Sequence, residues 1–182
     1  MDNIIIQDAS LEDAERISNI YAYYVKNTEI TFEYNVPTLN EIQNRIKNTM
    51  EHFPYLVIKQ AGIIQGYTYA SPSNTWAAYS RACETSIYIS HTAQKCGLGR
   101  KIYETLEHRL KEMGMFNLYA CVAYPGTEDS FLNKNSAGFH EYMGFSKIGE
   151  FHKCGYKSGR WYNMVYMEKL IGQHCASGFQ AI

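Results

Sequence analysis

Residues 84–113 constrain the fold of this chain more than any other segment, because they read as a strand, a glycine-bearing turn and a helix in succession. Residues 84–90 (E-T-S-I-Y-I-S) are rich in β-forming side chains, and residues 94–99 (Q-K-C-G-L-G) make the turn. Helical spacing then continues to Met113 and is followed by Gly114, the residue type most favoured directly after a helix. This order predicts an α/β domain.

The turn has the chemistry of an anion site. Gly97 and Gly99 lack a Cβ atom, so backbone N–H groups at the start of the helix can approach an anion that the helix dipole also favours. Lys95, Arg100 and Lys101 lie at the same end, where each cation costs about 0.3–1 kcal/mol unless an anion offsets it. A phosphate-binding turn accounts for both features, although two glycines alone are also typical of an ordinary tight turn.

Hydrophobic periodicity and turn residues predict the remaining elements. Boxes of the form S/T-x-x-D/E at Ser10 and Thr38 mark the starts of two helices, and Gly66 within a β-rich run suggests a bulge. The predicted strands are residues 4–6, 55–59, 63–70, 84–90, 117–123, 145–150 and 161–169, and the predicted helices are residues 11–25, 38–50, 97–113 and 135–143.

Length and charge restrict the organisation and the partners. A chain of 182 residues fits one domain, which we place at residues 1–171 with a flexible tail at 172–182. The net charge of -1 provides no basic field for a nucleic acid, and no apolar run is long enough to span a membrane. The five cysteines are scattered and odd in number, which argues against disulfides and a zinc site and favours a cytoplasmic location.

The turn Q-K-C-G-L-G fits the Q/R-x-x-G-x-G/A signature of the GNAT acetyltransferase superfamily. Four further segments resemble, in order, the phosphinothricin and methionine sulfoximine N-acetyltransferase branch, and together they reach to about Leu170. They are residues 27–33 (N-T-E-I-T-F-E), 84–91 (E-T-S-I-Y-I-S-H), 135–145 (N-S-A-G-F-H-E-Y-M-G-F) and 155–161 (G-Y-K-S-G-R-W).

This resemblance implies a mixed, mostly antiparallel sheet of about seven strands flanked by helices. Acetyl-CoA would enter where two central strands splay apart, with its pyrophosphate on the turn and its pantetheine arm along the strand backbone, as an added strand would lie. No metal is implied. The expected cofactor-binding residues are Ile87, Tyr88, Ile89, Gln94, Lys95, Cys96, Gly97, Leu98, Gly99, Arg100 and Asn135.

Glu84 is the candidate general base. Transfer of acetyl to an amine requires a neutral nitrogen, whereas amine pKa values run from about 8 to about 10.4, so a group must accept a proton. Period-2 alternation puts Glu84, Ser86 and Tyr88 on one strand face, and the resembling branch has a glutamate in this register. Pairing with a nearby cation is the structural alternative. Cys83 and Cys96 are not expected to act as nucleophiles.

His140 lies where many GNAT enzymes carry a tyrosine that protonates the departing thiolate, so it is either that acid or a structural hydrogen-bonding residue. Asn135 is expected to cap the short helix and to contact the cofactor. Tyr142, about 200° further round the helix, should point elsewhere.

By position, Phe32, Glu33 and Tyr34 would form the acceptor pocket, and Arg81 could hold an acceptor carboxylate in bidentate fashion. The resemblance implies a small amine substrate and a homodimer formed near Trp161. A protein or peptide N-acetyltransferase and a non-catalytic acetyl-CoA sensor are the alternatives.

Overall fold

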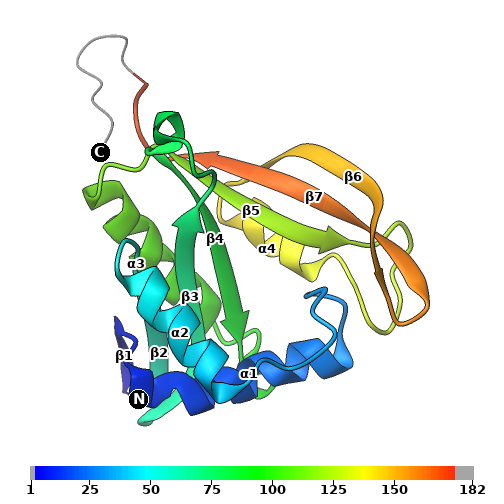
Figure 1. The fold of residues 1–182 in the computed structure, drawn as a ribbon, viewed down its shortest axis with the longest axis horizontal. Helices are drawn as coiled ribbons and strands as arrows, with labels where there is room; N and C mark the ends of the chain where they lie inside the picture. The colour runs from blue at the N-terminus through cyan, green and yellow to red at the C-terminus, as the bar shows by residue number, and fades with distance from the viewer. Residues whose placement is uncertain (1–2, 175–182) are drawn as a thin grey trace.

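The computed structural model describes residues 3–174, which form one seven-stranded sheet in the order β1-β2-β3-β4-β5-β7-β6 (Figure 1). The α/β prediction is confirmed. The strands are β1 (Ile4–Asp8), β2 (Tyr55–Gln60), β3 (Ile63–Pro72), β4 (Ala82–Ile89), β5 (Asn117–Tyr124), β6 (Ser146–Lys157) and β7 (Arg160–Leu170). The helices are α1 (Ala14–Asn27), α2 (Leu39–Met50), α3 (Leu98–Glu112) and α4 (Asn135–Tyr142), with short 3-10 turns at Leu11–Asp13, Ala77–Tyr79 and His91–Ala93.

Both predicted capping boxes form. Ser10 N donates to Asp13 Oδ2 at 2.9 Å, and a single 3-10 turn separates this box from α1. Thr38 N donates to Glu41 Oε2 at 2.6 Å while Glu41 N donates back to Thr38 Oγ1 at 3.3 Å, which fixes the start of α2. No helix within residues 3–174 is both long enough and apolar enough to cross a membrane.

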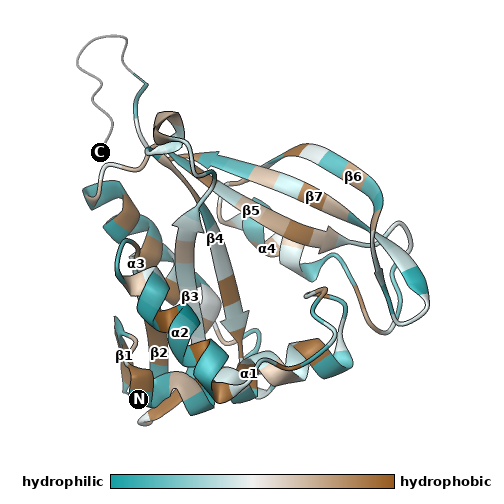
Figure 2. Ribbon diagram, in the orientation of Figure 1, coloured by the Kyte–Doolittle hydropathy of each residue, from teal (hydrophilic) through white to brown (hydrophobic). Residues whose placement is uncertain are grey.

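Alternate residues of β2 separate the core into two layers. Leu56 and Ile58 are fully buried against the α3 side, whereas Tyr55 and Val57 are buried with α1 and α2 on the other side. Figure 2 shows the matching pattern, with apolar colour on strands beneath the helices and hydrophilic colour on much of the outer surface of α2. Helices therefore cover both faces of the sheet across β2–β4.

The sheet opens between β4 and β5. These strands run parallel and pair only through Ala82–Asn117, Cys83–Leu118 and Glu84–Tyr119, whereas β5 pairs with β7 along its full length. Every other strand pairing in the described chain is antiparallel. Beyond Glu84 the two strands diverge, so the edge of β4 that carries Ile87 and Ile89 has no strand partner (Figure 1).

The bulge predicted in the third strand is present, whereas the sixth strand ends later than predicted. The bulge predicted at Gly66 is confirmed by a register shift between Ile58 and Lys59 on the facing strand. The sixth strand, predicted to end at residue 150, continues to Lys157, because an irregularity between Phe151 and Gly155 lets pairing resume toward the hairpin. Of the predicted tail, residues 172–174 are described, and residues 175–182 lie outside the described part.

Candidate active site

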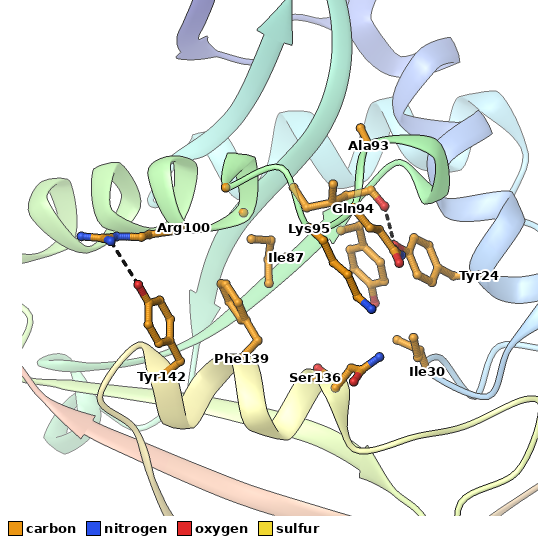
Figure 3. A pocket seen from close by; sticks show the side chains of 15 residues that line it. Tyr24, Ile30, Ile87, Ala93, Gln94, Lys95, Arg100, Ser136, Phe139 and Tyr142 are labelled. Atoms are coloured by element: carbon orange, nitrogen blue, oxygen red, sulfur yellow. Dashed lines mark hydrogen bonds between the residues drawn. The ribbon is translucent and has the colours of Figure 1, made fainter.

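A cavity of about 590 Å³ lies where α1, β4, the turn before α3, and α4 converge (Figure 3). Nine of the eleven predicted cofactor-binding residues line it, namely Ile87, Tyr88, Ile89, Gln94, Lys95, Gly97, Gly99, Arg100 and Asn135. The remaining wall comes from Tyr142 and from five residues for which the sequence predicts no role in the site: Tyr24, Ile30, Ala93, Ser136 and Phe139. Of the other two predicted residues, Cys96 is exposed and Leu98 is buried in the core.

The backbone of the turn is shaped for an anion. Lys95 and Gly97 both adopt positive φ, 60° and 76°, and Gly97 is the N-cap of α3. The first N–H groups of a helix have no partner within it and are left to bind a ligand, so those at the start of α3 are available beside Gly99. A Cβ atom at Gly99 would lie 3.5–3.7 Å from Phe139, Ile89 and Ile87, inside the cavity wall. Glycine here therefore keeps the backbone accessible.

Tyr24 joins three parts of the cavity. Its hydroxyl donates to the carbonyl oxygen of Ile89 at the end of β4 and accepts from Gln94 Nε2 at 3.1 Å (Figure 3). Burial raises the pKa of Tyr24, so the hydroxyl keeps its proton at neutral pH. One side chain of α1 thus fixes both the strand end and the turn.

A narrow cavity of about 50 Å³ passes between the diverging strands, lined by residues 85–88 of β4, residues 120–123 of β5, Ser136, His140 and Ile30. Glu84 directly precedes the lining residue Thr85 and belongs to the last pair of the β4–β5 ladder, but it is not one of the residues that line either cavity. Burial raises the pKa of Glu84 above its usual range, and its charge in turn helps to raise the pKa of Cys121 and Tyr166. A carboxylate with a raised pKa is closer to the pKa that a general base needs near neutral pH.

His140 is 4% exposed and is surrounded by the rings of Tyr103, Phe139 and Phe145. Its Nδ1 lies 2.8 Å from the carbonyl oxygen of Ser136, which can only accept, so Nδ1 carries the proton and Nε2 has none in the neutral ring. Burial lowers the pKa of His140, partly opposed by that hydrogen bond. Tyr142 is 67% exposed and receives a hydrogen bond from Arg100 Nη1 at 3.0 Å, which confirms its different orientation.

Asn135 does not cap α4, contrary to expectation. It is the first residue of the helix, and its own N–H donates to the side-chain oxygen of Asn133 at 3.0 Å. The N-cap position falls on Lys134, whose side chain makes no capping hydrogen bond, and Asn135 is among the residues of the cavity wall.

The loop between α1 and α2 carries the predicted acceptor residues, but each is engaged differently. Phe32 packs against Tyr162 and over Gly155, and Tyr34 is 66% exposed with its hydroxyl bound to the carbonyl oxygen of Tyr156. Glu33 forms a bidentate pair with Arg45 at 2.8 and 3.2 Å and also accepts from Tyr21 at 2.9 Å. From this loop, Ile30 is the residue that lines both cavities.

The structure corrects the expectation for Arg81. It directly precedes β4, at the opposite end of that strand from Ile87 and Ile89, and its Nη1 donates to the carbonyl oxygen of Gly114 at 3.3 Å. Its guanidinium also lies over the ring of Phe116, 5.8 Å from the centroid. Arg81 thus fastens the loop after α3 and is not placed to hold an acceptor carboxylate in the cavity.

Residues 6–166 match the acetyltransferase (GNAT) domain. The chain belongs to the GNAT acetyltransferase family. The chain is accordingly an acyltransferase enzyme.

Several GNAT relatives cover most of this chain. A phosphinothricin N-acetyltransferase from Alcaligenes faecalis is 32% identical over 88% of this chain and 79% of its own. An L-methionine sulfoximine/L-methionine sulfone acetyltransferase from Salmonella typhimurium is 26% identical over 94% and 96%. The crystal structure of a GNAT superfamily phosphinothricin acetyltransferase from Sinorhizobium meliloti in complex with AcCoA superposes with a TM-score of 0.86 at 28% identity, covering 96% of this chain and 92% of that one.

Proposed function

We propose that this acetyltransferase uses acetyl-CoA and transfers the acetyl group to the primary amine of a small amino-acid-like acceptor, of the phosphinothricin or methionine sulfoximine type. The observation that carries the proposal is the meeting, at one splayed strand pair, of an anion-binding turn, a free strand edge and a half-buried carboxylate. The names of the relatives above support the acceptor class.

Acetyl-CoA would be held by two backbone features. The N–H groups at the start of α3, beside Gly97 and Gly99, would bind the pyrophosphate, and the edge of β4 at Ile87 and Ile89, which has no strand partner, would bind the pantetheine arm. Lys95 and Arg100 add positive charge to the cavity wall, with Arg100 already paired with Glu104 at 2.7 Å. Within residues 3–174, no cluster of three or more His, Cys, Asp or Glu side chains could hold a metal ion.

The chemistry would be direct transfer in a ternary complex. The amine nitrogen bonds to the acetyl carbon, the carbon–sulfur bond breaks, CoA leaves as the thiolate, and the amine proton passes to Glu84, through water if the two are not in contact. Burial disfavours the charged form of Glu84 and so raises its proton affinity, which suits acceptance of that proton. Neither Cys83 nor Cys96 takes part: Cys83 is buried with its pKa raised to about 12, and Cys96 is exposed outside the cavity wall.

His140 is better suited to a positioning role than to that of a proton donor. A neutral ring protonated at Nδ1 has no proton at Nε2 to give to a thiolate, and the lowered pKa keeps the ring neutral at pH 7. We therefore propose that His140 holds α4 against Tyr103 and the strand pair, while the thiolate takes its proton from solvent at the open side of the cavity.

The alternative acceptor, a protein or peptide terminus, requires an open channel beside the α1–α2 loop. Here this loop is fastened to the β6–β7 hairpin by Tyr34 and by Phe32 packing on Gly155, which narrows the approach and favours a small acceptor. A sensor that only binds acetyl-CoA would need the turn but no half-buried Glu84.

The test is to follow free thiol while purified protein and acetyl-CoA are offered phosphinothricin, methionine sulfoximine, other amino acids and an N-terminal peptide panel. Turnover confined to the small amines supports the proposal. Turnover of peptides alone favours the protein acetyltransferase, and acetyl-CoA binding without turnover of any acceptor favours the sensor.

We also propose that the protein is a cytoplasmic homodimer, as its branch of the family implies. The β6–β7 hairpin exposes large apolar side chains, with Trp161 61% and Phe151 54% exposed, and such surfaces often mark contacts between subunits. Light scattering of the wild type and of Trp161→Arg tests this, because a dimer formed there should dissociate in the variant.

A further inference from the structure

Lys157 is a buried lysine whose ammonium group uses all three of its N–H donors in hydrogen bonds. The residue is 5% exposed, and its Nζ lies 2.9 Å from each of three carbonyl oxygens, those of Val25, Thr28 and Thr31. An ammonium group has three N–H donors, so one carbonyl is available for each. The carboxylate of Glu29, which is 1% exposed, lies 3.5 Å from the same nitrogen.

These oxygens belong to the C-terminal end of α1 and to the start of the α1–α2 loop. The last carbonyls of a helix have no partner within the helix and carry partial negative charge, so a cation there is favourable. Lys157 thus donates to free carbonyls of residues 25–31, as a capping side chain does at the end of a helix. It does so from a strand that is 126 residues or more away along the chain.

The position of Lys157 is itself fixed. It is the last residue of β6 and pairs with Arg160 across a two-residue turn in which Ser158 and Gly159 have φ of 48° and 81°. Positive φ at both central residues is the geometry of a tight hairpin turn whose twist matches that of the strands. The ammonium is therefore held by a rigid hairpin end.

The segment that Lys157 binds, residues 28–31, forms part of the cavity wall on the side proposed for the acceptor. Ile30, between two of the bound carbonyls, lines the larger cavity (Figure 3). It also lines the narrow cavity between β4 and β5. Thr31 Oγ1 lies 2.8 Å from the hydroxyl of Tyr21, which in turn donates to Glu33. A shift of this backbone would move the wall of the cavity next to the reacting atoms.

We propose that Lys157 is a positioning residue for acceptor binding, which sets residues 28–31 and hence Ile30 against the strand opening by binding the backbone carbonyls of Val25, Thr28 and Thr31. It touches neither cavity directly. A buried charge costs free energy unless it is fully paired, and a hydrophobic side chain in this space could not bind the three carbonyls, so the lysine imposes a geometry that packing alone would not. The inference rests on the proposed acetyl transfer for its kinetic part, but its structural part stands without it.

The test compares Lys157→Met, which keeps the length and removes the charge, with Lys153→Met, which removes an exposed lysine of the same strand. We expect Lys157→Met to raise KM for the acceptor 10-fold or more while the Kd for acetyl-CoA changes less than 2-fold. Backbone amides of residues 29–33 should exchange hydrogen at least 10-fold faster than in the wild type, with other strands unchanged. Lys153→Met should match the wild type in all three measurements.

An unchanged acceptor KM, or unchanged exchange in residues 29–33, would overturn the inference, as would equal loss of acceptor and acetyl-CoA affinity, since that indicates general damage. Should Lys157→Met fail to fold, Lys157→Gln retains a neutral donor for one or two of the carbonyls, and the same separation of KM from Kd is required of it. Absence of turnover by the wild type would instead contradict the proposed function, while the exchange comparison would still decide whether Lys157 orders the loop.

Discussion

Glu84 and Tyr119 form the last aligned pair of the parallel β4–β5 ladder, so the carboxylate lies where the two central strands begin to separate. A group at this point has protein on its paired side and the narrow cavity beyond it. That position explains why Glu84 is half-buried and why its pKa is raised, two properties that no local sequence pattern determines.

Replacement of Glu84 by glutamine should lower turnover without lowering stability. Loss of a general base typically costs about 10²- to 10⁴-fold in rate, and the remaining rate should lose its dependence on an ionisation near the raised pKa. The check is a pH–rate profile from pH 5 to 9, with Glu112→Gln, an exposed carboxylate on α3, as the control. Identical profiles for the wild type and Glu84→Gln would exclude Glu84 as the base.

Thermal unfolding of Glu84→Gln tests independently whether the pKa of Glu84 is raised in the folded state. Because the folded-state pKa lies above the unfolded value, the folded state binds the proton more tightly, and the stability that this confers is present at low pH and lost as pH rises through the folded pKa. Removal of the charge should therefore raise the Tm more at pH 8 than at pH 5. A lower Tm at pH 8 would mean that Glu84 is held by a stabilising ion pair.

The hydroxyl of Tyr24 should contribute to acetyl-CoA binding. Tyr24→Phe removes the hydrogen bonds to Ile89 and Gln94, and at about 1 kcal/mol per bond the Kd should rise about 5- to 30-fold. Titration calorimetry measures this, with Tyr23→Phe on the same helix as the matched control. An unchanged Kd would show that the turn holds its shape without Tyr24.

A side chain at Gly99 should block the cofactor cavity. Valine there would project between Phe139 and Ile87, so acetyl-CoA affinity should fall by at least 10-fold, or about 1.4 kcal/mol. Gly126→Ala places its methyl group in open space and should bind normally. Full binding by Gly99→Val would place the cofactor elsewhere.

His140 should matter for stability more than for proton transfer. His140→Phe removes the hydrogen bond from the ring to the carbonyl of Ser136, at a cost of about 0.5–1.5 kcal/mol in denaturant unfolding. Because burial lowers the pKa of His140, the stability that it confers is present above pH 6.5 and declines as pH falls toward the folded pKa. A loss of rate above 100-fold with unchanged stability would instead support a proton-donor role.

Elements with a strong local sequence signal are predicted correctly. Side-chain roles that depend on partners distant in the sequence are not. The strand–turn–helix unit and both capping boxes are local, and they fold as expected. The closeness of Arg81 to Glu84 in the sequence predicts that Arg81 binds the substrate. Its side chain instead donates to the carbonyl oxygen of Gly114, in the loop after α3. Tyr24 carried only the signal of a core-facing helix residue, and the partners of Glu33 and Lys157 come from other elements.

The most direct test of the central claim is a single-turnover reaction with acetyl-CoA labelled in its acetyl group and methionine sulfoximine or phosphinothricin, quenched in time and analysed by mass spectrometry. We expect one N-acetylated acceptor for each CoA released, no labelled enzyme at any time, and the loss of this single turnover in Glu84→Gln. A labelled enzyme that passes its acetyl group to the acceptor, or no transfer to any small amine while acetyl-CoA is bound, would contradict it.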